Sequence, residues 1–211
     1  GGLPFEPMLD HVAEMGVSGV EMTVGGWSPA PHLRADELLA DAGKRRAVLQ
    51  ALESRGLEIA ALNVSGNPLD PGELGARHKA DTDKTIELAG HLGVRKIVMM
   101  SGLPPASPED RIPNWITYTV SWPATLKDCL DYQWNEVAIP YWRKLVAKAE
   151  ASGVETFALD IDDARAGRGD GRRGRAPMHI DHAATAGIGV GEDARAEKIG
   201  RARAGIGVGD R

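Results

Sequence analysis

Residues 59–71, IAALNVSGNPLDP, pass from an apolar run directly into a Ser-Gly-Asn-Pro turn. Together with the residues just before it, the apolar run has the composition of a β-strand. Gly66 permits a tight turn, and Pro68 stiffens the chain that leaves it. The stretch therefore predicts a strand over residues 57–64 that ends abruptly, with amide and hydroxyl side chains at its carboxyl end.

Strand and helix patterns alternate on both sides of this stretch. Strands are expected at residues 16–24, 57–64, 95–100 and 154–160. Amphipathic helices are expected at residues 36–55, 77–93 and 128–152. Pro140 should kink or divide the last helix. An alternation with a period of roughly 35 residues predicts an α/β fold of βα units around a parallel sheet, and the period matches a (β/α)₈ barrel.

The predicted strands are too few to close such a barrel. A complete barrel usually needs about 250 residues, whereas this chain has 211. Closure would require one strand before Leu3 and three or more after Asp160. We therefore expect an incomplete TIM barrel over residues 1–160. Its open sheet edges predict aggregation or pairing with another copy of the chain, as a homo-oligomer.

Residues 161–211 differ in composition from the rest of the chain. Counted from Asp160, the last 52 residues contain 11 Gly, 10 Ala and 9 Arg, and no Leu, Phe, Tyr or Trp. Such a segment buries too little apolar surface to offset the entropy of ordering it, so we expect a disordered, Gly/Ala/Arg-rich tail. One hypothesis is an out-of-frame translation of a GC-rich gene, because Gly, Ala, Arg and Asp have GC-rich codons.

Composition excludes several classes of function. The net charge of −5 comes from 30 acidic and 25 basic residues spread along most of the chain, so no global field favours nucleic acid or anionic lipid. The single cysteine, Cys129, excludes an internal disulfide framework and a cysteine-based zinc site. No apolar run approaches the roughly 18 residues of a membrane span, and the N-terminus lacks a signal-peptide pattern. We expect a cytoplasmic protein without a membrane partner.

Polar and aromatic side chains follow the predicted strands, where reactive groups of parallel α/β folds gather. Asn63, Ser65 and Asn67 could donate and accept hydrogen bonds to a polyhydroxylated ligand, although Asn and Ser are also favoured turn residues. The loop tryptophans Trp27 and Trp115 could cover the C–H surface of a sugar or simply close the barrel mouth. Both interpretations remain open for each residue.

Charged and titratable residues occur at the same strand ends. Glu21 lies inside a strand pattern, where it is either a site residue or a salt-bridge partner. His32, between Pro31 and Leu33, is a candidate acid/base group or a hydrogen-bonded structural residue. Asp160 opens an acidic cluster that could bind a hard divalent cation or form a solvated turn.

Four blocks of the sequence carry a family resemblance. They are GVEMTVGGWSPAPHL, GLEIAALNVSGNPLDP, VMMSGLPPASPEDRIPNW and QWNEVAIPYWRKLVAKAEASGVE. In order and spacing they resemble consecutive blocks of the sugar phosphate isomerase/epimerase family, the xylose isomerase-like TIM barrels. The resemblance runs from Leu3 to Leu159, and it implies a barrel that is truncated at both ends.

The resemblance implies an isomerase or epimerase that acts on a sugar or sugar phosphate. In better-understood members a carboxylate pair moves a proton beside the sugar carbonyl, and a divalent metal (Mn, Mg, Zn or Co) polarises the oxygens. Glu21 and His32 are then the catalytic candidates. By this analogy the substrate cleft is lined by Asn63, Ser65, Asn67, Ser101, Asn114 and Trp115, and we add Trp27 from its predicted loop.

The sequence departs from the family after residue 159. Similar proteins carry a metal-binding Glu at the end of this strand and a His two residues later, where this chain has Asp160 and Asp162. Asp160 is thus the candidate metal ligand. Later ligand motifs such as Asp-Pro-Ser-His have no counterpart, and His179 and His182 have no predicted strand to hold them. A site with one fixed carboxylate would bind metal weakly at best, so the chain could be inactive.

A rival hypothesis is a non-catalytic remnant or a binding module that contacts nucleic acid through its tail. Residues 165–175, RAGRGDGRRGR, contain five Arg and one Asp, a local excess of four positive charges. Arg/Gly-rich RNA-binding segments usually interleave aromatics or repeat an Arg-Gly-Gly unit, and neither pattern occurs here. We therefore expect a small-molecule sugar substrate rather than a nucleic acid partner.

Overall fold

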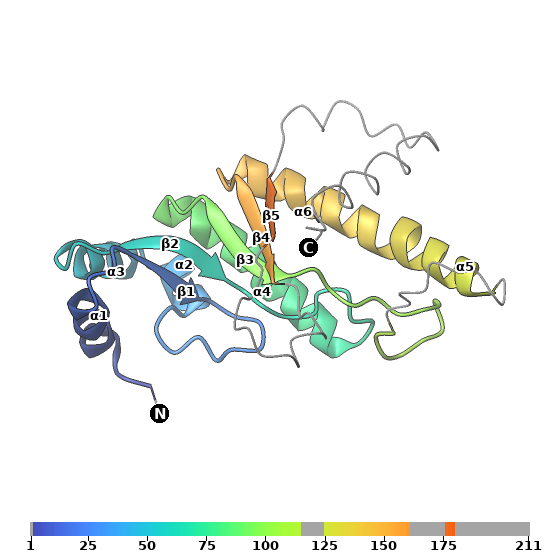
Figure 1. Ribbon diagram of the computed structural model, residues 1–211, viewed down its shortest axis with the longest axis horizontal. Coiled ribbons are helices and arrows are strands. Elements are labelled where there is room, and N and C mark those ends of the chain that lie inside the picture. The colour runs from blue at the N-terminus through green and yellow to red at the C-terminus, as the bar shows by residue number, and fades with distance from the viewer. Residues whose placement is uncertain (1, 115–124, 161–175, 180–211) are drawn as a thin grey trace, which may run out of the picture. The chain divides into compact units, whose positions relative to one another are not determined.

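The computed structural model describes residues 2–114, 125–160 and 176–179 (Figure 1). These residues belong to one compact unit, Gly1–His179. Four parallel strands lie side by side in chain order. They are β1 (Gly19–Thr23), β2 (Glu58–Asn63), β3 (Lys96–Met100) and β4 (Thr156–Asp160). The predicted α/β class and parallel sheet are confirmed, because each expected strand is present and joins its neighbour along the chain.

Helices alternate with these strands. They are α1 (Phe5–Glu14), α2 (Ala35–Ala40), α3 (Ala42–Glu53), α4 (Glu73–Leu92), α5 (Thr125–Asp131) and α6 (Ile139–Ala151), with a π-helix η1 (Tyr132–Ala138) between the last two. Helix α3 packs on β2 and α4 packs on β3. Trp142 of α6 contacts Phe157 of β4 edge to face, with ring centroids 5.7 Å apart. Within the described residues, no helix is both long and apolar enough to cross a bilayer.

A bulge between β1 and β2 decides which side chains share a face. Val20 pairs with Ile59, but Glu21 pairs with Ala61, so Ala60 is an extra residue on β2. Val20 and Ile59 pack against the cluster of Leu9, Leu52 and Leu57 beneath α1 and α3. Because side chains alternate along a strand, Glu21 lies on the opposite face from Val20, where it is exposed. The bulge places Ala61 and Asn63 of β2 on that same face as Glu21.

The first helix, α1, was not predicted from the sequence. It buries Leu9 against Leu52 and Leu57, and it is tied to the end of α3 by one arginine. Arg55 contacts Asp10 through Nε at 2.6 Å and Glu6 through Nη2 at 2.7 Å. Arg55 and Asp10 are 45 positions apart in the sequence, and so a local sequence pattern cannot predict their contact.

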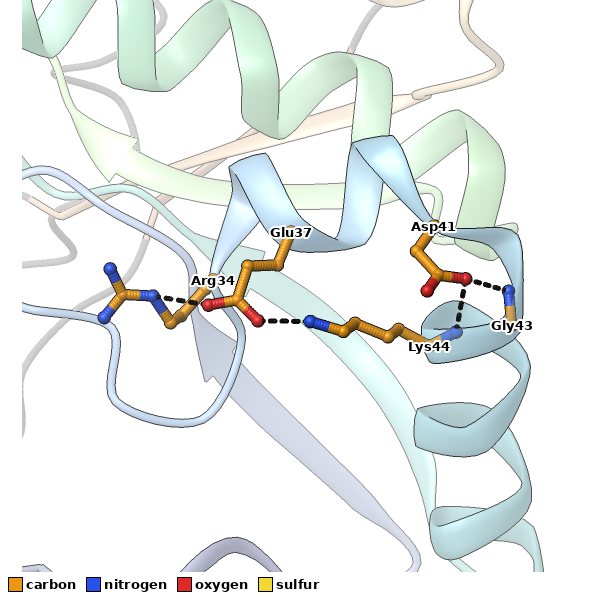
Figure 2. Close-up of polar contacts among 5 residues, drawn as sticks. All are labelled: Arg34, Glu37, Asp41, Gly43 and Lys44. Carbon is orange, nitrogen blue, oxygen red and sulfur yellow. Dashed lines mark hydrogen bonds and ion pairs between the residues drawn. The ribbon is translucent and has the colours of Figure 1, made fainter.

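The predicted helix over residues 36–55 is in fact two helices, which meet at Asp41 (Figure 2). Asp41 has an extended backbone and caps α3. Its Oδ1 accepts hydrogen bonds from the backbone N–H groups of Gly43 at 2.7 Å and Lys44 at 3.2 Å. These bonds satisfy two of the amides that a helix start leaves without a partner.

The predicted helix over residues 128–152 is divided, as Pro140 suggested. Pro140 lies in the first turn of α6, directly after the π-helix. A proline has no N–H and its ring clashes with the carbonyl four residues earlier in an α-helix. The wider π turn, in which Ile139 N–H donates to Trp134 O, lets the chain enter α6 without that clash.

One further strand lies in the segment that was predicted to be a tail without strands. Strand β5 (Ala176–His179) pairs antiparallel with β4, with His179 opposite Thr156. The expectation that no strand holds His179 is therefore wrong, and the edge of β4 is paired rather than open. The amino-acid composition did not predict this strand, because β5 is held by backbone pairing with β4, which does not require an apolar run of residues. The rest of the predicted tail, with Asp162, Asp163, His182 and the Arg/Gly run of residues 165–175, lies outside the described residues.

Candidate functional site

The loops that leave β1, β2 and β3 are joined by backbone hydrogen bonds at the carboxyl edge of the sheet. Val24 N–H donates to Asn63 O at 2.8 Å, and Trp27 N–H donates to Ser65 O at 2.9 Å. Val64 N–H donates to Val98 O at 2.9 Å. These bonds continue the parallel ladders past the strand ends, so the polar residues of the three loops are held at one edge.

Glu21 and Asn63 are joined directly at this edge. Asn63 Nδ2 donates to Glu21 Oε1 at 2.8 Å, and Asn63 Oδ1 accepts from the Ser65 backbone N–H at 2.9 Å. The second bond fixes which end of the amide faces Glu21, because a backbone N–H can only donate. Glu21 thus has a neutral amide as a partner, and its carboxylate is exposed on the face of the sheet away from α1 and α3.

The first loop depends on a glycine that approaches β2 closely. Gly26 has a φ of 77°, and a Cβ at this position would overlap the Ser65 carbonyl oxygen. Its N–H donates to Asp81 Oδ2 of α4 at 3.1 Å. Asp81 also lines a pocket of about 220 Å³ beside the loop, together with charged residues such as Arg34 and Lys84. Trp27, the next residue, is 55% exposed.

Asn67 braces the loops. Only 5% of Asn67 is exposed, and its Oδ1 accepts from the backbone N–H groups of Leu103 at 2.7 Å and Leu69 at 3.2 Å. Its Nδ2 donates to Leu103 O at 3.0 Å. These bonds tie the loop after β2 to the loop after β3. Because the amide is largely committed to backbone groups, the geometry favours the turn interpretation of Asn67 over ligand contact.

Two further expected cleft residues, Ser101 and Asn114, make hydrogen bonds through their backbone groups. The Ser101 carbonyl accepts from Trp142 Nε1 at 3.2 Å, and the Asn114 carbonyl accepts from Gln133 Nε2. Asn114 N–H donates to Pro104 O at 2.8 Å. Ser101 and Asn114 are both exposed. Trp115 lies outside the described residues, so its place in the cleft stays a prediction.

His32 lies among the helices near α1. Its ring packs against Phe5 with centroids 5.9 Å apart, and it lines a pocket of about 340 Å³ with residues of α2 and α3. Glu37 in that pocket contacts Lys44 Nζ at 2.7 Å and Arg34 Nε at 3.0 Å (Figure 2). The hydrogen bond from Lys44 lowers the pKa of Glu37 and raises the pKa of Lys44. The contact with Phe5 supports the structural interpretation of His32.

His78 is the residue that sequence reasoning missed. It lies on α4, is 1% exposed, and accepts a hydrogen bond at Nδ1 from the Asn67 backbone N–H at 2.8 Å. The Trp27 ring meets the His78 ring edge to face, with centroids 5.4 Å apart. A helical pattern predicts which residues of α4 face the sheet, but it does not say that a buried histidine there contacts two loops.

The described side chains do not form a metal centre. Nowhere in the part of the chain that the structure describes do three or more His, Cys, Asp or Glu side chains come together to hold an ion. Asp160 pairs through its backbone with Met100 at the carboxyl end of β4, and its side chain is outside the described part. The described side chains alone thus supply no complete ligand set for a divalent metal, and the role of Asp160 stays a prediction.

Comparison with known proteins assigns the family. A family model described as "Xylose isomerase-like TIM barrel" matches residues 9–165. The chain belongs to this family. Its parallel βα units are thus part of a xylose isomerase-like TIM barrel, and the resemblance of the four sequence blocks is confirmed. Over 160 residues the chain is 64% identical to the uncharacterized protein YfiH of Bacillus subtilis strain 168. The matched stretch covers 76% of this chain and 51% of YfiH. The chain spans about half the length of this curated relative.

Solved structures are similar to the chain at lower identity and with TM-scores below 0.5. One is D-psicose 3-epimerase with D-tagatose from Clostridium cellulolyticum H10, at 17% identity and a TM-score of 0.43, covering 76% of this chain and 47% of that chain. Another is a xylose isomerase-like TIM barrel protein from Mycobacterium smegmatis in complex with magnesium, at 22% identity and a TM-score of 0.42, covering 73% and 45%. The family assignment rests on the family model, which matches residues 9–165.

Proposed function

We propose that the carboxyl edge of this sheet belongs to a site that isomerises or epimerises a sugar or sugar phosphate. The observation that carries the proposal is the pairing of Glu21 with Asn63 in a chain of the xylose isomerase-like family. Both reactions move a proton at the carbon beside a carbonyl, which requires a carboxylate held in a fixed orientation within reach of that carbon.

Glu21 is the base in this proposal. The amide of Asn63 orients this carboxylate by donating a hydrogen bond to Oε1 at 2.8 Å. Glu21 would take the proton from the carbon beside the carbonyl and deliver it to the carbonyl carbon, while the hydroxyl proton of the first carbon moves to the carbonyl oxygen; this gives isomerisation. Epimerisation needs, in addition, a second acid that returns a proton to the opposite face of the same carbon.

The substrate would lie against the exposed residues of the three loops. Trp27 offers an aromatic face to the C–H surface of a sugar. Ser101 and Asn114 offer a hydroxyl and an amide that are exposed. Asn63 is half-buried, and its Nδ2 keeps one hydrogen beyond the bond to Glu21. Asn67 and Ser65 shape the turn behind them, and Trp115 remains part of the proposed set. We leave His32 out of the catalytic pair because of its contact with Phe5.

Metal assistance is a separate proposal that rests on Asp160, and the proton transfer above does not depend on it. Calorimetric titration with Mn²⁺ of the wild-type chain and of Asp160→Ala tests it. A saturable binding heat in wild type that is abolished in Asp160→Ala would support Asp160 as a ligand. No binding heat in either protein, or the same binding heat in both proteins, would contradict that role. Asp110→Ala is a matched control, since Asp110 holds the Ala106 N–H in the loop after β3.

Binding of ketoses tests the sugar site itself. We expect aldoses and ketoses, free and phosphorylated, to change the tryptophan fluorescence of the wild-type chain and to have much less effect on Trp27→Leu. The control is Trp134→Leu, an exposed tryptophan of the π-helix. A chain that binds none of these sugars would overturn the proposed function.

A further inference from the structure

His78 has one defined protonation pattern in this structure. Its Nδ1 accepts from the Asn67 backbone N–H at 2.8 Å, and a backbone N–H can only donate. Nδ1 therefore carries no proton, and a neutral imidazole must carry its proton on Nε2. Among the described residues, the buried Nε2 has no hydrogen-bond partner, so the bond at Nδ1 is the polar contact that orients the ring.

The ring of His78 is packed between two loops. Gly66 lies directly against it, since a Cβ at position 66 would be 2.8 Å from His78 Cγ and 2.9 Å from Nδ1. Trp27 of the loop after β1 meets the same ring edge to face at 5.4 Å. Only a glycine at position 66 lets the chain pass this close to the ring.

The hydrogen bond of His78 also reaches the loop after β3. Asn67, whose N–H bonds to His78, is joined through its side chain to both the N–H and the carbonyl of Leu103. His78 is thus in contact with the loops after β1 and β2, and it acts on the third loop through Asn67. It is anchored on α4, where Thr82 Oγ1 donates to the His78 carbonyl at 2.8 Å.

We propose that His78, as the neutral Nε2–H tautomer, is a positioning residue that holds the three carboxyl-edge loops in the arrangement that presents Trp27 and Asn63 to a sugar. The proposal rests on the proposed function for its ligand, but the arrangement of the loops can be measured without any ligand. His78 is too deeply buried to touch a substrate, so its effect is exerted through Asn67, Gly66 and Trp27.

Two substitutions separate the hydrogen bond from the packing. In His78→Asn, the amide oxygen can occupy the position of Nδ1 and still accept from Asn67 N–H. In His78→Phe, the ring remains but the acceptor is lost. We expect hydrogen exchange of the Asn67 amide to accelerate about tenfold in His78→Phe, as for loss of one hydrogen bond, and to stay near the wild-type rate in His78→Asn.

The tautomer itself is measured on the wild-type chain, so the test does not depend on either variant folding. ¹⁵N-NMR at neutral pH should show His78 Nδ1 as an unprotonated nitrogen and Nε2 as a protonated one. A protonated Nδ1, or equal exchange of the Asn67 amide in wild type and His78→Phe, would overturn the role of His78. Weaker sugar binding in His78→Phe that His78→Asn restores would support it, whereas absence of sugar binding by the wild-type chain would overturn the proposed function alone.

Discussion

Asn63 Nδ2 on β2 donates a hydrogen bond to Glu21 Oε1 on β1 over 2.8 Å. The bulge at Ala60 places Asn63 on the same face of the sheet as Glu21, and the Ser65 backbone N–H fixes the orientation of the Asn63 amide. One irregular residue in β2 and one loop amide together therefore determine how the Asn63 amide meets the carboxylate.

Asn63→Asp should destabilise the fold by up to about 1 kcal/mol at neutral pH and low salt, because two carboxylates then face each other across neighbouring strands. The new carboxylate still accepts from Ser65 N–H, so only the contact with Glu21 changes. Added salt should recover part of the loss by screening. Urea unfolding at two ionic strengths measures the effect, with exposed Asn114→Asp as the control. A loss that salt does not reduce would contradict the electrostatic explanation.

Gly26→Ala should cost about 3 kcal/mol of unfolding free energy, because a Cβ there overlaps the Ser65 carbonyl and the backbone has a positive φ. Gly56→Ala is a matched control, since Gly56 also has a positive φ, of 67°, but its Cβ would meet no atom within 4 Å. Its cost should be about 1 kcal/mol, from the backbone alone. Urea unfolding compares the two variants, and equal losses would argue against a tight contact between the first two loops.

Asn67→Ala should destabilise the chain by about 3 kcal/mol, because the backbone N–H groups of Leu69 and Leu103 lose their acceptor inside the loops. The exposed Asn114→Ala should change the unfolding free energy little. Hydrogen exchange of the Leu103 amide gives a local measure of the same loss. If sugar affinity fell in Asn67→Ala with no change in stability or in Leu103 exchange, Asn67 would be a ligand contact instead of a brace.

The cap at Asp41 predicts a dependence of stability on pH. Hydrogen bonds from the backbone N–H groups of Lys44 and Gly43 lower the pKa of Asp41 from its ordinary value of 3.8. A lowered folded-state pKa stabilises the fold above the unfolded-state pKa, and this contribution is lost as pH falls through the folded-state pKa. The urea midpoint of wild type should therefore exceed that of Asp41→Asn at neutral pH, and the two should converge in acid. A constant difference across this range would contradict the predicted ionisation.

The strands were predictable from the sequence because apolar runs bounded by glycine and turn residues are local signals. Strand β2 is predicted at residues 57–64 and observed at Glu58–Asn63. The break at Asp41 also has a local signal, an aspartate with a glycine two residues later, but the apolar spacing of the two helices obscured it. Helix α1 and strand β5 were missed because each is held by residues distant in the sequence, such as Arg55 and β4.

The sequence singled out Glu21, Asn63 and Trp27 but did not say which residues they contact. In the structure Asn63 bonds to Glu21 and Trp27 N–H bonds to Ser65 O, while their place in a sugar site stays a prediction. Sequence could not separate Asn63, whose amide holds Glu21, from Asn67, whose amide holds Leu103. The difference depends on which distant loop each asparagine contacts, and a sequence pattern does not give such contacts. His78 was missed for the same reason, because it contacts the distant loop residue Asn67.

Exchange of the proton beside the sugar carbonyl measures the step assigned to Glu21. Ketoses and aldoses, free and phosphorylated, are incubated with the chain in D₂O, with and without Mn²⁺, and followed by ¹H-NMR. We predict loss of the signal at the carbon beside the carbonyl for at least one sugar, slowed at least about a hundredfold in Glu21→Gln and unchanged in Glu14→Gln, an exposed carboxylate of α1. No exchange with any sugar, or equal exchange in wild type and Glu21→Gln, would contradict the proposed function.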